Sequence, residues 1–294
     1  PRHDIVVQFE YPQGGKRQCD PARARAVLLQ SPRIKVVQQH QRPDRHHQPV
    51  MLSVAAHPVS NQPAQGLSTA REAKEGRVHH AAIDLPGPLA YAILPFSPFA
   101  TELAVAANSS GKEVLLHLPM EAEASNHLLG PGALNTDMTR DAFVAALRRA
   151  LNAVPHLSGV NNHMGSRLTR DLERMRWLMA ELRNTENLLY IDSRTTPRSV
   201  ARQAAEEAEI PFVARDIFLD NRRETSYIHA QIDALIAHAR SNGDGVGIAH
   251  PYPETIAVLL ERLKMLDGIR LVSLSTLLGR RECRRANGVS KISH

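Results

Sequence analysis

The stretch Lys112-Glu-Val-Leu-Leu-His-Leu-Pro-Met-Glu121 decides the fold that we predict from this sequence. Its apolar run, residues 114–116, is typical of a strand that is buried on both faces of a parallel sheet. Pro119 has no N–H for a sheet ladder, so we expect the strand to end there. His117 and Glu121 then lie at the carboxyl end of the strand, where α/β proteins bind ligands. The pair could reach one cation; the alternative is a buried histidine bonded to backbone and a surface glutamate.

Strands alternate with helices on both sides of this stretch. Seven apolar runs with strand character are separated by helical segments, at residues 89–94, 114–116, 159–162, 188–191, 211–214, 246–249 and 269–274. This alternation predicts parallel βαβ units. We therefore expect a distorted or incomplete (β/α) barrel of about seven parallel strands, with an open doubly wound sheet as the alternative. The sequence has no Gly-x-Gly-x-x-Gly turn and no phosphate-binding loop, so it signals no nucleotide site.

The net charge of +6 lies at the two ends of the 294-residue chain. Residues 1–80 carry 12 Lys+Arg against 6 Asp+Glu, and residues 280–294 carry five basic residues and one acid. The middle of the chain is therefore slightly acidic, and we expect no nucleic-acid partner. No apolar run is long enough to cross a bilayer and no signal-peptide pattern is visible. The oligomeric state stays open.

Composition divides the chain into three parts. Residues 1–80 are rich in Gln, His, Pro and Arg, and only 5–9 and 50–56 have the character of short strands or helical turns. We expect this segment to be poorly ordered, because it offers little apolar surface to offset the entropy of folding. Residues 81–279 should form the barrel, and residues 280–294 a basic tail.

Each predicted strand ends in a cluster of polar residues. These clusters are residues 161–167, 192–196, 215–216 with 220–221, and 250–255. Carboxyl ends of parallel strands meet at one rim, so side chains from these clusters can build an active site from βα loops. The Ser and Thr residues are better explained as helix caps, whereas His163, His250 and Asp192 are not.

The motifs HLPME, GVNNHMGSRLT, IDSRTT, RDIFLDN and GIAHPYPET stand in this order at the predicted strand ends. Over residues 82–279 the chain thereby resembles the divergent polysaccharide deacetylases. These are bacterial envelope proteins distantly related to the metal-dependent carbohydrate esterases that remove N- or O-acetyl groups. The resemblance implies a distorted (β/α) barrel, a carbohydrate substrate and a periplasmic or other extracytoplasmic location.

The resemblance also implies roles for individual residues. In the metal motif of the parent superfamily a second histidine stands where this chain has Glu121. The resemblance therefore implies a divalent metal, with zinc as the expected ion, held by His117, Glu121 and His163. The implied catalytic residues are His250 as general acid, with Asp192 or Asp216 as the base or the group that orients it. The implied substrate-binding residues are Asn162, Arg167, Arg215 and Tyr252.

The chain departs from the family pattern at the first strand, which normally ends in two aspartates. Here residues 77–80 run directly into 81–86, and Asp84 belongs to the loop before the next strand. We interpret residues 1–80 as not encoding the usual first strand, as a reading-frame change upstream would produce. The resemblance implies a metal-dependent hydrolase that removes acetyl groups from an envelope polysaccharide or oligosaccharide, impaired by loss of the aspartates. The alternative is a non-catalytic barrel that binds glycan or protein.

Overall fold

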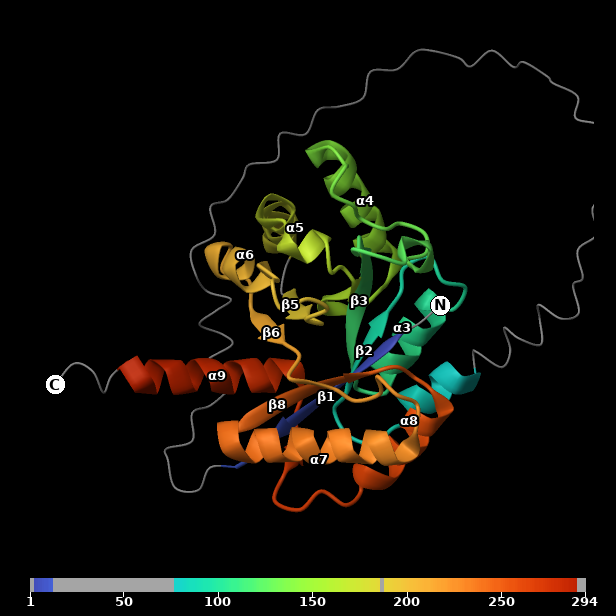
Figure 1. Cartoon of the computed structure of the whole chain (residues 1–294), viewed down its shortest axis with the longest axis vertical. Coiled ribbons are helices and arrows are strands. Elements are labelled where there is room, and N and C mark those ends of the chain that lie inside the picture. Colours follow the sequence, from blue (N-terminus) through green and yellow to red (C-terminus); the bar gives the residue numbers. More distant parts are fainter. Residues whose placement is uncertain (1–2, 13–76, 186–187, 290–294) are drawn as a thin grey trace, which may run out of the picture.

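The computed structural model describes residues 3–12, 77–185 and 188–289, and in them one curved sheet of nine strands is surrounded by helices (Figure 1). The strand order is β6-β5-β4-β3-β2-β1-β8-β7, and β9 also pairs with β1. The strands are β1 (Asp4–Glu10), β2 (Ala90–Ile93), β3 (Glu113–Met120), β4 (Leu157–Met164), β5 (Leu189–Asp192), β6 (Phe212–Ala214), β7 (Ile217–Phe218), β8 (Asp244–Ala249) and β9 (Arg270–Leu271). This mixed α/β half-barrel confirms the predicted incomplete barrel and excludes the open doubly wound sheet.

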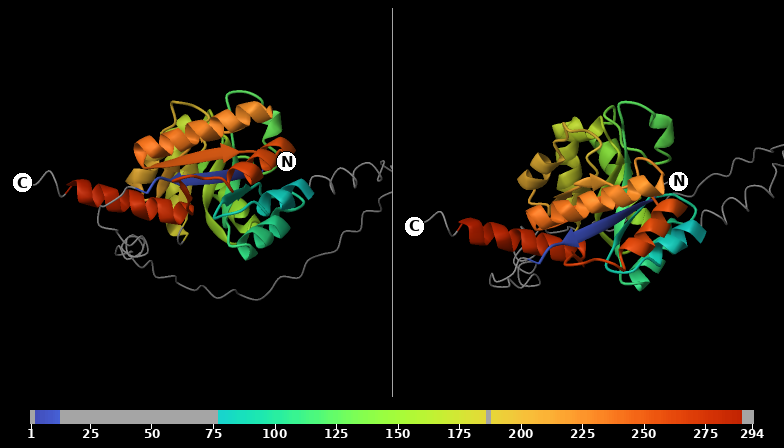
Figure 2. Two further views of the ribbon diagram at one scale, coloured as in Figure 1. Left: turned by 90° about the horizontal axis from the view of Figure 1, so that it is seen from below. Right: turned by 60° about the horizontal axis from the view of Figure 1, so that its bottom comes forward.

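Strand β1 runs against the rest of the sheet. It pairs antiparallel with β2 on one side and with β8 on the other, whereas β2 through β6 pair in parallel, as do β7 and β8. The left view of Figure 2 shows β1, in blue, alongside β8. Because β1 is reversed, its first residues, and not its last, lie at the edge where the parallel strands end.

The two ends of the sheet, β6 and β7, are joined by only two residues of chain. The backbone N–H of Arg215 donates to the carbonyl of Asp192 at 2.9 Å, and that of Asp216 donates to the carbonyl of Val246 at 2.8 Å. These bonds attach the crossing segment to β5 on one side and to β8 on the other. The segment therefore spans the remaining gap and brings the edges of the curved sheet together.

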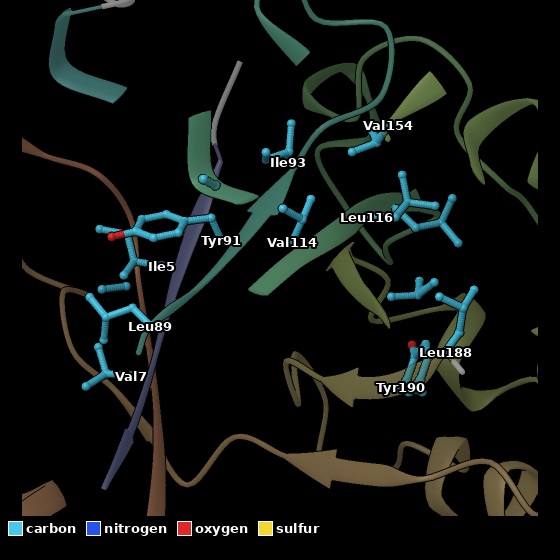
Figure 3. Packing of buried hydrophobic residues seen from close by; sticks show 14 of the residues in the cluster. Ile5, Val7, Leu89, Tyr91, Ile93, Val114, Leu116, Val154, Leu188 and Tyr190 are labelled. Carbon is cyan, nitrogen blue, oxygen red and sulfur yellow. The ribbon is translucent and has the colours of Figure 1, made fainter. Parts of the chain in front are cut away.

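Helices cover the outer face of the sheet and bury its outward-facing apolar residues (Figure 3). Tyr91, Val114, Leu116 and Tyr190 are among these residues, and all are at most 4% exposed. The helices are α3 (Ala100–Ser109), α4 (Arg140–Ala153), α5 (Leu172–Asn184), α6 (Ala201–Glu207), α7 (Thr225–Asn242), α8 (Pro253–Arg262) and α9 (Leu274–Val289), with the short 3-10 turns η1 (Asn126–Leu128) and η2 (Leu168–Arg170). Residues 77–83 are also helical.

A second, smaller core fills the inside of the half-barrel. Its strand residues alternate with those of the outer core: Val6, Leu115 and Ile248 point inward, and the start of α9 closes the lower end with Leu274 and Leu277. The Glu113 carboxylate accepts hydrogen bonds from the N–H groups of Leu274 at 2.6 Å and Ser275 at 3.0 Å. Glu113 thus satisfies two of the free N–H groups at the N-terminus of α9 and fixes that helix to the barrel.

Residues 280–289 of the predicted basic tail lie in a helix. Helix α9 continues to Val289, and Figure 1 shows it projecting beyond the sheet. Arg281 Nη2 lies 2.5 Å from Asp244 Oδ1, Arg284 also pairs with Asp244, and Arg280 pairs with the buried Glu10. These ion pairs hold α9 against β1 and β8, so the positive charges of Arg280, Arg281 and Arg284 stabilise the fold.

The prediction that β3 ends at Pro119 is wrong, because the strand continues to Met120. The carbonyl of Pro119 accepts from Leu134 N at 2.9 Å, so this edge of β3 faces the loop around Leu134 and not β4. Strand β2 makes its last pair at Leu116, before the proline is reached. The missing N–H therefore removes no bond from the ladder.

The N-terminal segment also differs in part from its prediction. Residues 5–9 do lie in a strand, β1, which occupies the position between β2 and β8 but in the reverse direction. Most of the predicted low-order segment, including the run at 50–56, lies outside the described residues. Strand β7 has no counterpart among the seven predicted strands, since two residues are too short for a pattern.

We expect Glu113→Ala to lower the free energy of unfolding by about 1–2 kcal/mol, since two helix N–H groups lose their acceptor. Urea denaturation followed by circular dichroism measures this. Glu102→Ala is the matched control, because Glu102 is 62% exposed and pairs with the partly exposed His80. Equal losses in the two variants would contradict the role of Glu113.

Candidate functional site

The inward-facing rows of three strands change from apolar to ionisable at the mouth of the half-barrel. Side chains on one face of a strand repeat every two residues. The row of Val6 continues to Asp4, that of Leu115 to His117, and that of Ile248 to His250. In β4, Asn161 and then His163 lie at the same mouth, each within hydrogen-bond distance of His117. Residues far apart in the sequence therefore converge at one place.

A hydrogen bond from Asn161 fixes the protonation of His117. The amide nitrogen of Asn161 donates to the carbonyl of Ile191 at 2.9 Å, and a carbonyl can only accept. The Asn161 Oδ1 atom therefore faces His117 Nδ1, at 2.8 Å. Since an amide oxygen also only accepts, Nδ1 carries the proton and Nε2 of His117 presents a lone pair to the mouth.

Two further groups surround that lone pair. His163 Nδ1 lies 3.0 Å from His117 Nε2, and Asp4 Oδ2 lies 3.4 Å from it. Burial lowers the pKa of His117 well below its usual value, and the neighbouring His163 and His3 lower it further. A neutral imidazole nitrogen and a carboxylate both accept, so their close approach favours a shared cation between them.

The donors of this mouth have the chemistry of a metal site, and one of their separations suits a bound metal ion. Ligands bound at 2.0–2.1 Å in a tetrahedron lie about 3.3 Å apart, close to the Asp4–His117 distance of 3.4 Å. Yet in the residues that the structure describes, no group of three or more His, Cys, Asp or Glu residues is placed so that it could hold a metal ion. The Asp4–His117 separation therefore fits a cation, while a complete ligand set is not formed.

His250 is held by Asp220, not by Asp192 or Asp216 as predicted. Asp220 Oδ1 lies 3.1 Å from His250 Nδ1, and its Oδ2 accepts from the backbone N–H of His250 at 2.8 Å. Thr255 Oγ1 also donates to Oδ2, at 2.9 Å. The Nε2 atom of His250 lies 3.9 Å from Asp4 Oδ1, so this ring edge faces the mouth.

The other two predicted catalytic carboxylates organise loops. Asp192 belongs to the outward-facing row of Tyr190, and it accepts from Arg194 N at 2.8 Å and from Ser199 Oγ at 2.7 Å. Asp216 Oδ2 accepts from Val246 N at 2.9 Å. None of these hydrogen bonds involves His250. Strand alternation directs Asp192 outward, and the closing loop directs Asp216 toward Val246.

Glu121, the predicted metal ligand, binds a neighbouring loop. Its Oε2 accepts from Thr136 N and from Thr136 Oγ1, both at 2.7 Å, and its Oε1 lies 3.3 Å from Arg167. The structure thus brings His117 and His163 together, with Asp4 beside them, and turns Glu121 toward Thr136 and Arg167. A ligand role for Glu121 stays a prediction without a supporting contact.

The four predicted substrate-binding residues divide into two kinds. Asn162 is fully buried and bonds Ser193 N at 2.8 Å and Met164 O at 2.7 Å, so its amide serves the backbone. Arg167, Arg215 and Tyr252 lie in loops at the carboxyl edge of the sheet. The ring of Tyr252 is 5.1 Å from that of His250, which places it beside the site.

Four residues of the site escaped prediction: Asp4, Asn161, Asp220 and His3. Asn161 and Asp220 stand in the polar clusters that mark the strand ends, but strands buried on both faces give no pattern that tells inward from outward positions. Asp4 and His3 lie in a segment whose composition argues against order. His3 Nδ1 accepts from Leu94 N at 2.9 Å and so ties β1 to the end of β2.

The comparisons with known proteins agree with this fold. The model of the divergent polysaccharide deacetylase family matches residues 73–278. An uncharacterized protein of Escherichia coli (strain K12), YibQ, is 38% identical over 195 residues, which are 66% of this chain and 60% of that protein. An uncharacterized protein of Haemophilus influenzae is 36% identical over 198 residues, 67% of this chain and 70% of that protein. The chain thus spans less than two thirds of the length of the first relative.

A solved structure is also similar in fold. The crystal structure of the uncharacterized protein ATU2773 from Agrobacterium tumefaciens C58 matches with a TM-score of 0.65 and 24% identity, covering 68% of this chain and 83% of that one. The half-barrel and its mouth therefore define a deacetylase-like fold. By the family match and the two relatives, the chain belongs to the divergent polysaccharide deacetylase family. In its described residues no helix is long and apolar enough to span a membrane.

We expect the protein to lose stability as the pH falls from 7 to 5. Burial, followed by the charge of His79, lowers the pKa of His3 to about 3, and burial also lowers that of His117. Near pH 6.5 these histidines bind protons in the unfolded chain but stay unprotonated in the folded chain. Each such histidine therefore reduces the free energy of unfolding by up to about 1.4 kcal/mol per pH unit.

Urea denaturation at a series of pH values measures this slope. His3→Asn should make the slope shallower, whereas His127→Gln, in the exposed turn η1, should leave it unchanged. A stability that is flat between pH 7 and 5 in the parent protein would show that these imidazoles accept protons without opposing the fold.

Proposed function

We propose that the protein is a metal-dependent hydrolase that removes acetyl groups from a polysaccharide or oligosaccharide of the bacterial cell envelope, in the periplasm or an equivalent extracytoplasmic compartment. One observation carries the proposal: Asp4, His117, His163 and His250 meet at one mouth of the half-barrel, with Nε2 of His117 3.0 Å from His163 Nδ1 and 3.4 Å from the Asp4 carboxylate. Membership of the divergent polysaccharide deacetylase family supports the choice of an acetylated sugar as substrate.

Asp4, His117 and His163 are the residues that would hold a divalent cation, which we propose to be zinc. When bound, such an ion lowers the pKa of a bound water from 15.7 to about 7 and polarises a carbonyl group. Asn161 prepares the site in advance, because its bond to Nδ1 keeps the lone pair of His117 at Nε2. Asp4 supplies the negative charge that two neutral imidazoles lack.

His250 is the proposed proton donor to the leaving amine or alcohol. Asp220 accepts the Nδ1 proton, so Nε2 is the atom that exchanges a proton at the mouth. The buried carboxylate of Asp220 also stabilises the imidazolium form of the ring. The rings of Phe218, at 5.3 Å, and Tyr252, at 5.1 Å, flank His250 and restrict its movement.

The first prediction from this proposal concerns His250. We expect His250→Ala to lower the rate of acetyl release from N-acetylated oligosaccharides about 10²–10⁴-fold, because general acid catalysis contributes that much. Zinc content, measured by mass spectrometry of the purified protein, should be retained. Asp220→Asn should lower the rate in the same direction, and His156→Asn, on an exposed loop, should not. If His250→Ala keeps the full rate of acetyl release, His250 is not the proton donor.

The second prediction separates two possible ligand sets. Asp4→Ala and His117→Ala should abolish binding of stoichiometric zinc, whereas Glu121→Gln should keep it, since Glu121 bonds Thr136. Isothermal titration with zinc chloride measures the affinity without any need for turnover. Loss of zinc in Glu121→Gln together with retention in Asp4→Ala would restore the ligand set predicted from sequence and refute the one proposed from the contacts.

A second candidate function is a barrel that binds envelope glycan, or a protein, without catalysis. The observation in its favour is that, among the described residues, no three His, Cys, Asp or Glu side chains are placed so that they could bind one metal ion. The zinc titration of the parent protein decides between the two functions. Stoichiometric binding with acetyl release supports the hydrolase, and glycan binding without zinc supports the non-catalytic barrel.

A further inference from the structure

Two arginines at the mouth differ from most other arginines of the protein in their surroundings. Nearby guanidiniums lie close to carboxylates, as in the pairs of Arg167 with Glu121 at 3.3 Å and Arg223 with Glu254 at 3.0 Å. Neither Arg194 nor Arg215 forms an ion pair with another residue in the described part of the chain, taking 4.0 Å as the limit. The carboxyl edge of the sheet thus carries two cationic groups that the fold does not neutralise by contact.

Arg215 is half-buried and is held in place by neutral groups. Its Nε donates to the carbonyl of Ser193 at 2.6 Å, and its Nη2 to the carbonyl of Arg194 at 3.0 Å. Burial lowers the pKa of Arg215, and the charge of Arg194 lowers it further, while the charges of Asp192, Asp216 and Asp4 oppose this. A cation in such surroundings gains much from an anion at contact distance, because a guanidinium binds carboxylate or phosphate through two parallel hydrogen bonds.

Arg194 stands in a strained backbone conformation. Its φ angle is +49°, in the left-handed region that residues with a Cβ rarely adopt. The N–H of Arg194 donates to Asp192 at 2.8 Å, and its carbonyl accepts from Arg215. The surrounding bonds therefore hold this residue where its exposed side chain carries a second positive charge close to Arg215. Strain of this kind gathers at ligand-binding positions.

A stack of side chains connects the arginines to the proposed catalytic histidine. The guanidinium of Arg215 lies 5.2 Å from the centre of the Phe218 ring, and that ring lies 5.3 Å from the ring of His250. Arg215 also belongs to the inward-facing row of Val213, which ends at the same mouth as His117. One aromatic ring thus separates the cationic pair from the place where the acetyl group would react.

From these observations we infer that Arg194 and Arg215 form a subsite for an anionic group of the substrate, a carboxylate or a phosphate carried by a sugar next to the acetylated one. This inference rests on the proposed function, because it names the charge of the same substrate. Bulk charge does not suggest it, since residues 81–279 carry a net negative charge. The subsite is local, made by two side chains from adjacent strand ends.

Binding of three small sugars to the full chain tests the inference. The probes are N-acetylglucosamine, N-acetylglucosamine 6-phosphate, and a disaccharide of N-acetylglucosamine with glucuronic acid, titrated at low ionic strength because salt screens such contacts. We expect at least one charged probe to bind about tenfold more tightly than the neutral one. The charged probe that binds more tightly identifies the anion as phosphate or carboxylate.

Two variants and a matched control assign the preference to the arginines. Arg194→Gln should reduce the preference about fivefold without disturbing the fold, because its side chain is exposed. Arg215→Gln should abolish it, and circular dichroism checks that this variant is folded. Arg222→Gln is the control. Arg222 lies in the loop before α7, its side chain is also exposed, and its guanidinium lies over the ring of Tyr227.

The outcomes are distinct from those that test the hydrolase. Equal binding of all three sugars, no binding of any, or an equal loss in Arg194→Gln and Arg222→Gln overturns the anionic subsite. Acetyl release from neutral oligosaccharides without a preference for charge would leave the hydrolase standing and remove the subsite. A preference for a charged sugar without acetyl release would keep the subsite and remove the hydrolase.

Discussion

The two-residue repeat of side chains along a strand is the constraint on which this structure depends. Each strand of the half-barrel buries one row of side chains against helices and the other row inside. The inner rows are apolar through the body of the sheet and reach the mouth as Asp4, His117 and His250. A shift of one residue in any strand would move its histidine or aspartate from the mouth to the helix layer. The register of the sheet therefore determines the composition of the site.

The reversed strand β1 shows how the same mouth can receive a carboxylate from either direction of chain. A parallel strand offers its last residues to the carboxyl edge, and an antiparallel strand offers its first. Asp4 reaches His117 at 3.4 Å because β1 enters the sheet at that edge and runs away from it. Asp4 therefore lies at the mouth although β1 runs antiparallel to both of its neighbours.

Much of the barrel could be predicted from the sequence because its signals are local. Alternating apolar runs and helical segments predicted the parallel strands on either side of β1, and the polar clusters predicted the rim where His117, His163 and His250 meet. Tertiary context decided the rest. The sequence did not favour Asn161 over Asn162 or Asp220 over Asp192, because strands buried on both faces do not show which row faces inward. The prediction that the strand ends at Pro119 was wrong for a similar reason. Only the structure shows that β2 makes its last pair before Pro119, so that the missing N–H costs no ladder hydrogen bond.

The central place of β1 also bears on how the molecule is assembled. Its residues pair with Ala90 to Ala92 on one side and with Asp244 to Ala249 on the other, so its partners arrive early and very late in the chain. Contacts between segments so distant in sequence form slowly, because a long loop must close before they contribute any free energy. A ribosome making this chain must finish β8 before the first strand can settle between its neighbours. Asp4 can therefore lie beside both His117 and His250 only after residue 250 has been synthesised.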